Sequence, residues 1–158
     1  MNGIRIFKEL PRDDPVANGK DPGDVPYGEI SVKRLLEIFP AWVESRDRYT
    51  PHQEFVEKLK GTAPVAIRIF FGAWCPDCGV MVPRFLKILD AAGLTGRLDV
   101  SLCALDRLKR FPEGLVNRYG IKFVPTFVFE RVGKEIGRIV ETPSSPSLEE
   151  DMWKILGE

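Results

Sequence analysis

Two cysteines separated by two residues, Cys75 and Cys78, narrow the range of folds open to this chain most sharply. Cysteines at this spacing can close into a disulfide ring and reopen, or they can supply two ligands to a structural zinc site. An apolar, β-rich run over residues 65–71 precedes the pair, and a helical pattern follows it from Gly79 onward. A pair between a strand and a helix indicates a redox site. The chain holds no second Cys-x-x-Cys and no Cys-x-x-His, so a zinc site would have to be shared between two chains.

The length and charge balance are those of an ordinary single-domain globular protein. A chain of 158 residues should bury roughly 70% of its unfolded surface, enough for a core without a disulfide or a metal. The 23 basic and 23 acidic residues cancel, which argues against nucleic acid or an anionic membrane as the main partner, because both favour a basic surface. No stretch approaches the ~18 apolar residues of a membrane span, and the opening residues lack the apolar segment of a signal peptide. We therefore expect a cytoplasmic protein, and we expect a monomer.

The pattern of helices and strands divides the chain into three parts. Residues 1–30 are rich in Pro, Gly and Asp and are predicted to form a loop-rich lead-in. Residues 31–61 carry two helical patterns, the first interrupted at Pro40 and the second starting with Thr50 as its N-cap. Residues 62–158 alternate strands with helices, which is typical of a mixed sheet covered on both faces.

The third part is predicted in more detail from its apolar periodicity and its turn residues. Strands are expected over residues 65–71, 99–105, 123–129 and 135–140, the last two forming a hairpin. Helices are expected from the cysteine pair to about Ala92 with a kink at Pro83, over residues 112–119, and from a capping box at Ser147 to the end.

Three local features of this third part resemble the thioredoxin family. The first is Trp74 directly before the cysteine pair, after an apolar strand, and the second is Pro83, at the place of the family's helix-kinking proline. The third is the segment 119–126, Tyr-Gly-Ile-x-x-Val-Pro-Thr, which is similar to the family segment that carries a cis-proline. The resemblance covers residues 62–157. It implies an α/β, thioredoxin-like fold, a central mixed sheet flanked by helices, with residues 31–61 as an N-terminal helical extension.

The chemistry of disulfide exchange assigns roles to the residues of the pair. A thiolate is the nucleophile, and Cys75 would lie at a helix N-terminus, where unpaired N–H groups favour negative charge. We therefore predict that Cys75 attacks a substrate disulfide and that Cys78, one turn along and more buried, resolves the mixed disulfide. The carboxylate of Asp77 opposes a second negative charge nearby. Pro76 stiffens the first helical turn, where its missing N–H costs little.

The resemblance implies further site residues. In the family the cis-proline, here Pro125, packs beside the active disulfide, and the backbone of the preceding residue, here Val124, pairs with an extended substrate segment. Trp74 would be a half-exposed aromatic residue beside the site. The chain departs from the family at Ile69, six residues before the first cysteine, where thioredoxins usually carry a buried Asp that accepts the proton of the second thiol.

Two functions follow as hypotheses. The first is a thiol–disulfide oxidoreductase that reduces protein or small-molecule disulfides through the Cys75/Cys78 dithiol, with electrons from a thioredoxin-reductase-like or thiol donor. This function needs no bound cofactor and no metal, because the redox-active disulfide is itself the redox group. The alternative is a binding or docking module on the same fold with weak or specialised redox activity. The N-terminal helices and the missing Asp at Ile69 motivate it.

Other reactive side chains are predicted to have structural roles. Cys103 lies in an apolar strand and is expected to be a buried apolar side chain rather than a third redox thiol. His52 is expected to be an exposed or capping residue of a helix start. Arg68 interrupts an apolar strand and should lie at a strand end or pair with a carboxylate. The basic run 107–110, Arg-Leu-Lys-Arg, is expected to be a solvated loop, with docking of an acidic partner as the alternative.

Overall fold

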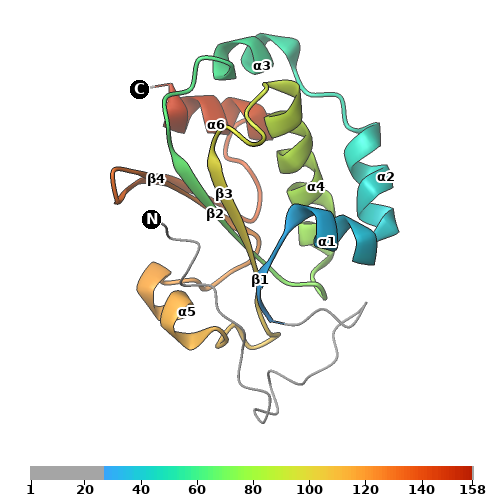
Figure 1. Cartoon of the computed structure of the whole chain (residues 1–158), viewed down its shortest axis with the longest axis vertical. Helices are drawn as coiled ribbons and strands as arrows, with labels where there is room; N and C mark the ends of the chain where they lie inside the picture. The colour runs from blue at the N-terminus through green and yellow to red at the C-terminus, as the bar shows by residue number, and fades with distance from the viewer. Residues whose placement is uncertain (1–26, 158) are drawn as a thin grey trace.

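The computed structural model of the chain describes residues 27–157, which contain one five-stranded mixed sheet. The strands are β1 (Gly28–Ile30), β2 (Ala66–Phe71), β3 (Asp99–Ala104), β4 (Thr126–Arg131) and β5 (Lys134–Val140). They lie in the order β1-β3-β2-β4-β5. β2 and β3 run parallel, and the other neighbouring pairs run antiparallel (Figure 1). The thioredoxin-like α/β fold predicted from the sequence is confirmed.

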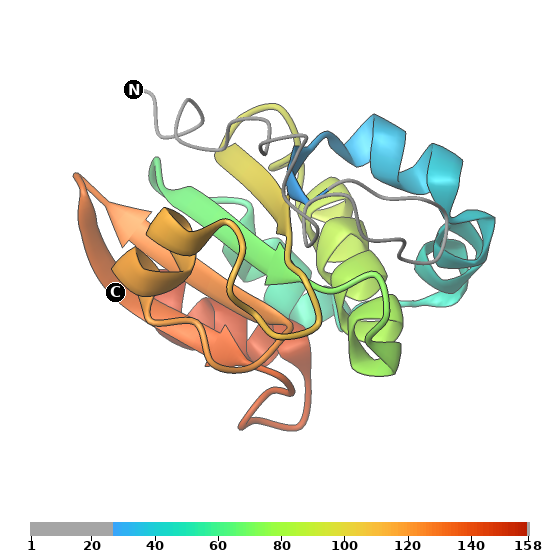
Figure 2. The same cartoon turned by 90° about the horizontal axis from the view of Figure 1, so that it is seen from below.

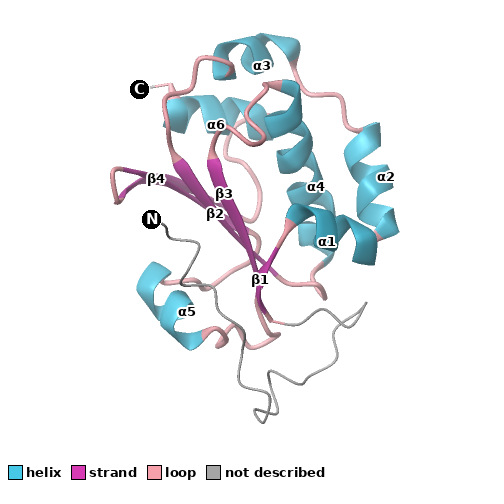
Figure 3. Cartoon of the chain, viewed as in Figure 1, coloured by secondary structure: helices cyan, strands magenta, loops and turns pink. Residues whose placement is uncertain are grey.

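Six helices accompany the sheet in the described part of the chain. They are α1 (Val32–Ile38), α2 (Pro40–Arg48), α3 (Gln53–Leu59), α4 (Pro76–Ala91), α5 (Glu113–Tyr119) and α6 (Leu148–Leu156). The helix α2 packs along α4, α3 packs on α6, and α5 stands apart from this group (Figures 1 and 3). Within residues 27–157, no helix is both long enough and apolar enough to cross a membrane.

Aromatic contacts show which face of the sheet each helix covers. Phe85 of α4 stacks on Phe127 with 4.4 Å between ring centroids, and Ile69 of β2 is the register partner of Phe127. Phe70, the next residue in β2, points to the opposite face, where its ring lies 5.2 Å from that of Tyr119 in α5. Figure 2 shows α5 and α4 on opposite sides of the strands. β2 is therefore covered on both sides, which explains its nearly continuous apolar run.

Arg68 is the charged exception within β2. Its side chain is buried, and its guanidinium lies 3.3 Å from the carboxylate of Asp99 and 3.4 Å from that of Glu130. Its Nη1 donates to the hydroxyl of Ser101, its register partner in β3, at 3.2 Å. A buried charge needs such opposite charges close by. The sequence left open whether Arg68 lies at a strand end or pairs with a carboxylate, and the structure shows the pairing.

Local signals in the sequence predicted several element boundaries correctly. The helical pattern is interrupted at Pro40, which is the first residue of α2, where its missing N–H removes no helical hydrogen bond. Gly120 ends α5 in the left-handed conformation, with φ 61°. Ser147 caps α6, since its hydroxyl accepts the N–H of Glu150 at 3.2 Å. These signals succeed because each depends on residues within one turn.

The loop-rich lead-in predicted for residues 1–30 ends in a strand that the sequence analysis did not identify, at residues 28–30. These residues form β1, which pairs antiparallel with β3 at the edge of the sheet. Tyr27 and Ile30 are buried there. A three-residue strand is too short to show an alternating pattern, so its partner strand decides its conformation. The rest of the predicted lead-in, residues 1–26, lies outside the described residues.

The predicted start of α3 was wrong. Thr50 is not the N-cap; α3 begins at Gln53, with the exposed His52 as its N-cap. The His52 N–H is bonded instead by Glu149 of α6, whose Oε2 accepts it at 2.6 Å while its Oε1 accepts the Tyr49 hydroxyl at 2.5 Å. Burial and then the bond to Glu149 raise the pKa of Tyr49, so the hydroxyl remains a donor. A carboxylate distant in sequence thus fixes this helix start.

We predict that Glu149→Gln lowers the free energy of unfolding by about 1–3 kcal/mol. The fully buried carboxylate accepts hydrogen bonds from the Tyr49 hydroxyl and the His52 N–H. An amide has only one oxygen, so its NH2 group would face one of these two donors and that hydrogen bond would be lost. Urea unfolding followed by circular dichroism measures the change. The matched control is Glu150→Gln, which removes only a 3.8 Å surface ion pair with Lys154 and should change stability by less than about 0.5 kcal/mol. Equal losses in the two variants would contradict the role given to Glu149.

Candidate active site

The predicted cysteine pair lies where β2 leads into α4. Cys75 is the N-cap of α4, and its sulfur accepts the N–H of Cys78 at 3.4 Å. Pro76 is the first helical residue, and the exposed Asp77 lies in the first turn. Both cysteines are free thiols. The sulfur of Cys75 therefore occupies the position where unpaired helix amides and the helix dipole favour a negative charge.

The two thiols differ in their environment. Cys75 is half-buried, whereas Cys78 is fully buried. Burial raises the pKa of the Cys78 thiol far above its ordinary value, and this outweighs the opposite effect of the Gly72 N–H, which donates to the Cys78 sulfur at 3.4 Å. The negative charge of Asp77 acts in the same direction as burial. At neutral pH Cys78 is thus a protonated, inaccessible thiol, and Cys75 is the sulfur that a substrate can reach.

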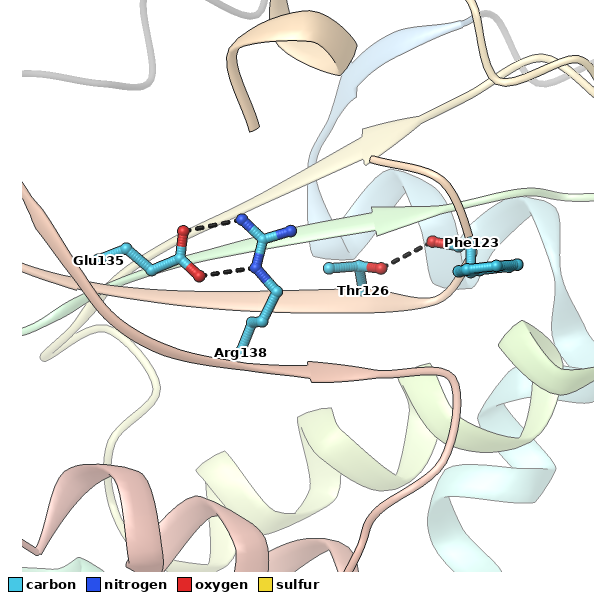
Figure 4. Close-up of polar contacts among 4 residues, drawn as sticks. All are labelled: Phe123, Thr126, Glu135 and Arg138. Carbon is cyan, nitrogen blue, oxygen red and sulfur yellow. Dashed lines mark hydrogen bonds and ion pairs between the residues drawn. The ribbon is translucent and has the colours of Figure 1, made fainter. Parts of the chain in front are cut away.

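A segment far along the chain completes the site. The Cys75 thiol donates to the carbonyl of Val124 at 3.6 Å, and the Val124–Pro125 peptide bond is cis. The turn before β4 is tied by the Thr126 hydroxyl, which donates to the Phe123 carbonyl at 2.7 Å (Figure 4). The structure therefore brings together Cys75, Cys78 and the backbone of Val124.

The hairpin of β4 and β5 carries a charged contact within β5. Arg138 of β5 binds Glu135 through Nε at 2.6 Å and Nη2 at 2.7 Å (Figure 4). This bidentate bond lowers the pKa of Glu135. The pair joins two residues of one strand, and we assign it to the hairpin rather than to the site.

Trp74 is fixed beside the reactive sulfur. Its indole N–H donates to the carbonyl of Leu105 at 3.1 Å, and its ring lies against Gly72, where any Cβ would overlap the ring atoms. Arg107 and Lys109 lie over the ring, at 5.8 Å and 5.3 Å from its centroid. The sequence analysis missed Gly72; a glycine between an apolar strand and the Trp-Cys pair was the available signal. It also missed the contact of the basic run with Trp74.

The remaining predicted residues are placed as follows. Ile69 is fully buried in β2 and belongs to the apolar core. Cys103 is fully buried in β3, where burial raises its pKa, so it is a structural side chain as predicted. Among residues 27–157, no group of three or more His, Cys, Asp or Glu side chains is placed to hold a metal ion.

Trp42 connects the N-terminal helices to the active-site helix. It is buried, and its ring stacks on that of Phe39 with 4.8 Å between the centroids. Its indole nitrogen lies 3.1 Å from the position that a Cβ would take on Gly79. Gly79 directly follows Cys78, so α2 packs against the part of α4 that carries the second cysteine.

Comparison with known proteins identifies the family of this chain. The family model "Thioredoxin" matches residues 48–154. Bovine protein disulfide-isomerase A5 is 27% identical over 107 residues, which are 66% of this chain and 20% of the isomerase. Thioredoxin H7 of Arabidopsis thaliana is 29% identical over 104 residues, which are 65% of this chain and 71% of that protein. This chain belongs to the thioredoxin family, which is a family of thiol–disulfide oxidoreductase type.

A solved structure shares the fold at lower identity. A protein of unknown function from Pseudomonas aeruginosa superposes with a TM-score of 0.55 at 16% identity, and the match covers 81% of this chain and 96% of that one. At this identity the likeness concerns the fold alone. Its coverage extends further along this chain than the matches to the isomerase or to thioredoxin H7.

We predict that iodoacetamide at neutral pH labels the folded, reduced protein on Cys75 alone. Cys78 is buried, and its raised pKa keeps the thiol protonated at neutral pH and still at pH values near the ordinary cysteine pKa of about 8.5. Cys103 is buried in the same way. Intact mass and peptide mapping should find one modification, and two more only after unfolding in urea. Cys75→Ser should take up no label while folded. Labelling of Cys78 in the folded protein at the rate of Cys75 would contradict the assignment.

Proposed function

We propose that this protein reduces disulfide bonds through the Cys75/Cys78 dithiol. The observation that carries the proposal is the pairing of a reachable sulfur at the N-terminus of α4 with a buried, protonated thiol one turn further along. Membership of the thioredoxin family supports it. The family relationship alone leaves the particular substrates open, because the isomerase and thioredoxin H7 are only 27% and 29% identical to this chain.

The reaction has two exchange steps. The Cys75 thiolate attacks one sulfur of the substrate disulfide, forming a mixed disulfide and releasing the other substrate sulfur as a thiolate, which takes a proton. Cys78 then loses its proton and attacks the Cys75 sulfur. The bond between Cys75 and the substrate breaks, the second substrate thiol leaves, and a Cys75–Cys78 disulfide forms. Two electrons pass from the protein dithiol to the substrate.

The second step must overcome the high proton affinity of Cys78. The position where thioredoxins usually place a buried carboxylate holds Ile69, which is fully buried and apolar. Water, the substrate thiolate released in the first step, or Asp77 on the exposed first turn would have to accept the proton. We therefore propose that resolution by Cys78 is the slower of the two steps. The mixed disulfide would then have an extended lifetime.

Substrate positioning is assigned to the backbone before β4. The carbonyl of Val124 lies 3.6 Å from the Cys75 sulfur, next to Pro125. An extended substrate segment can add to this backbone as a short strand, which places its disulfide beside Cys75. We propose that the oxidised protein is returned to the dithiol by a thioredoxin-reductase-like protein or a cytoplasmic thiol pool, and that no cofactor is bound.

A docking function is the second candidate. Trp42 of α2 packs against Gly79 of α4, and α1 in turn contacts α2. This packing beside the active-site helix supports a role for the N-terminal helices in holding a partner. In that case the dithiol would be redox-competent, but catalytic turnover would not be the main activity.

We predict that the protein accelerates the reduction of insulin disulfides by dithiothreitol. Turbidity from the freed insulin B chain measures the rate. Cys75→Ser should fall to the uncatalysed rate because the attacking sulfur is gone, and Cys78→Ser should stall at the mixed disulfide. Cys103→Ser, which changes a cysteine outside the site, should keep the activity and serves as the control. A wild-type rate equal to that of Cys75→Ser would reject the reductase and favour the docking function.

A further inference from the structure

The basic run 107–110 forms an ordered loop at the edge of the active site. The carboxylate of Asp106 is buried and accepts three backbone N–H groups of this loop, from Leu108 at 3.2 Å, Arg110 at 2.7 Å and Phe111 at 2.8 Å. Lys109 adopts the left-handed conformation, with φ 56°, and its N–H donates to the Asp106 carbonyl at 2.9 Å. A lysine takes this conformation only where surrounding contacts impose it. These bonds therefore hold the backbone of the loop in one conformation.

Two of these cations lie over Trp74, the residue directly before Cys75. The guanidinium of Arg107 and the ammonium of Lys109 lie 5.8 Å and 5.3 Å from the centroid of its ring. The ring attracts both cations through its negative face. The indole is itself fixed by its bond to Leu105. Arg107 and Lys109 thus belong to the surface around Trp74, next to the residue that carries the reachable sulfur.

The charge of this loop is free to act on a partner. Within residues 27–157, none of Arg107, Lys109 and Arg110 takes part in an ion pair. The negative charge of Asp106 is turned inward and is already satisfied by the loop's own N–H groups. The cationic side chains therefore produce a positive potential at one rim of the site.

The neighbouring surface agrees with a protein partner. Leu108 is 64% exposed and Phe123, next to Val124, is 53% exposed, so apolar side chains accompany the cations. The segments around the pair are residues 74–79 and 105–125, together with Glu141, whose N–H donates to the Pro125 carbonyl at 2.7 Å. Apart from the buried Asp106, their charged residues are the cations Arg107, Lys109, Arg110, Arg118 and Lys122 and the carboxylates Asp77, Glu113 and Glu141. Five cations against three carboxylates give these segments a positive balance, although the whole chain has none.

We propose that Arg107 and Lys109 select disulfides that lie in acidic protein segments. The inference rests on the proposed reductase function and adds the substrate class. Carboxylates flanking a substrate disulfide would be attracted to the rim, which raises the rate of productive encounter and holds the disulfide over Cys75. Because the cations are at the surface, salt must weaken the effect. Apolar contacts with Leu108 and Phe123 would strengthen the binding of such a segment, but they would not distinguish acidic from basic segments.

Two synthetic peptides with one intramolecular disulfide each test this proposal. They are identical except that Asp residues flank the cysteines in one and Lys residues in the other, and the full chain reduces them with dithiothreitol as electron donor. The wild type should favour the Asp peptide by about tenfold in kcat/KM at low ionic strength, within the range of electrostatic steering. The preference should shrink at high salt. Arg107→Ala/Lys109→Ala should lose most of it, and Arg107→Glu/Lys109→Glu should reverse it.

Two control variants separate charge from folding. Lys134→Glu/Lys154→Glu changes the net charge as much as the double Glu variant, but at the turn between β4 and β5 and in the last turn of α6; it should keep the wild-type preference. Arg107→Lys/Lys109→Arg keeps both charges and should keep the preference as well. Equal reduction of both peptides by the wild type, or an unchanged preference in the Ala variant, would overturn the charge selection. Failure to reduce either peptide would overturn the reductase function, and this inference with it.

Discussion

The hydrogen bond from the Cys78 N–H to the Cys75 sulfur determines the arrangement on which the rest of this site depends. It makes Cys75 the N-cap of α4, so that its sulfur lies where the unpaired amides of a helix attract negative charge. The same turn carries Cys78 into the protein, where burial keeps its thiol protonated. One short connection between β2 and α4 therefore makes two chemically identical side chains unequal, which is what sequential disulfide exchange requires.

This turn is held by backbone groups at the ends of three central strands. Gly72, directly after β2, donates to the Cys78 sulfur and leaves room for the ring of Trp74. Leu105, directly after β3, accepts the indole N–H of Trp74, and Val124, shortly before β4, accepts the Cys75 thiol. A site supported by rigid strands keeps its geometry better than one built on loops alone. The proposed substrate selection would lie in the more exposed segments around it.

The sequence predicted the parts of this protein that depend on neighbouring residues, and it missed those that depend on distant ones. The cysteine pair at the strand–helix junction, the interruption at Pro40 and the cap at Ser147 follow from local spacing. The strand β1 was missed because β3 decides its conformation. The start of α3 was misplaced because the group that bonds it, Glu149, lies 97 residues further on. The contact of the basic run with Trp74 could not be predicted, since it depends on hydrogen bonds to a buried carboxylate.

The pairing of Cys75 with Cys78 is the central claim, and mass spectrometry of the oxidised protein tests it most directly. Mild oxidation of the folded chain should remove two hydrogens, and proteolysis without reduction should yield one peptide pair linked through these two cysteines. Cys103, buried in β3, should remain a free thiol throughout. An oxidised chain that keeps Cys78 free, with Cys75 linked to a second chain or to Cys103, would contradict the account.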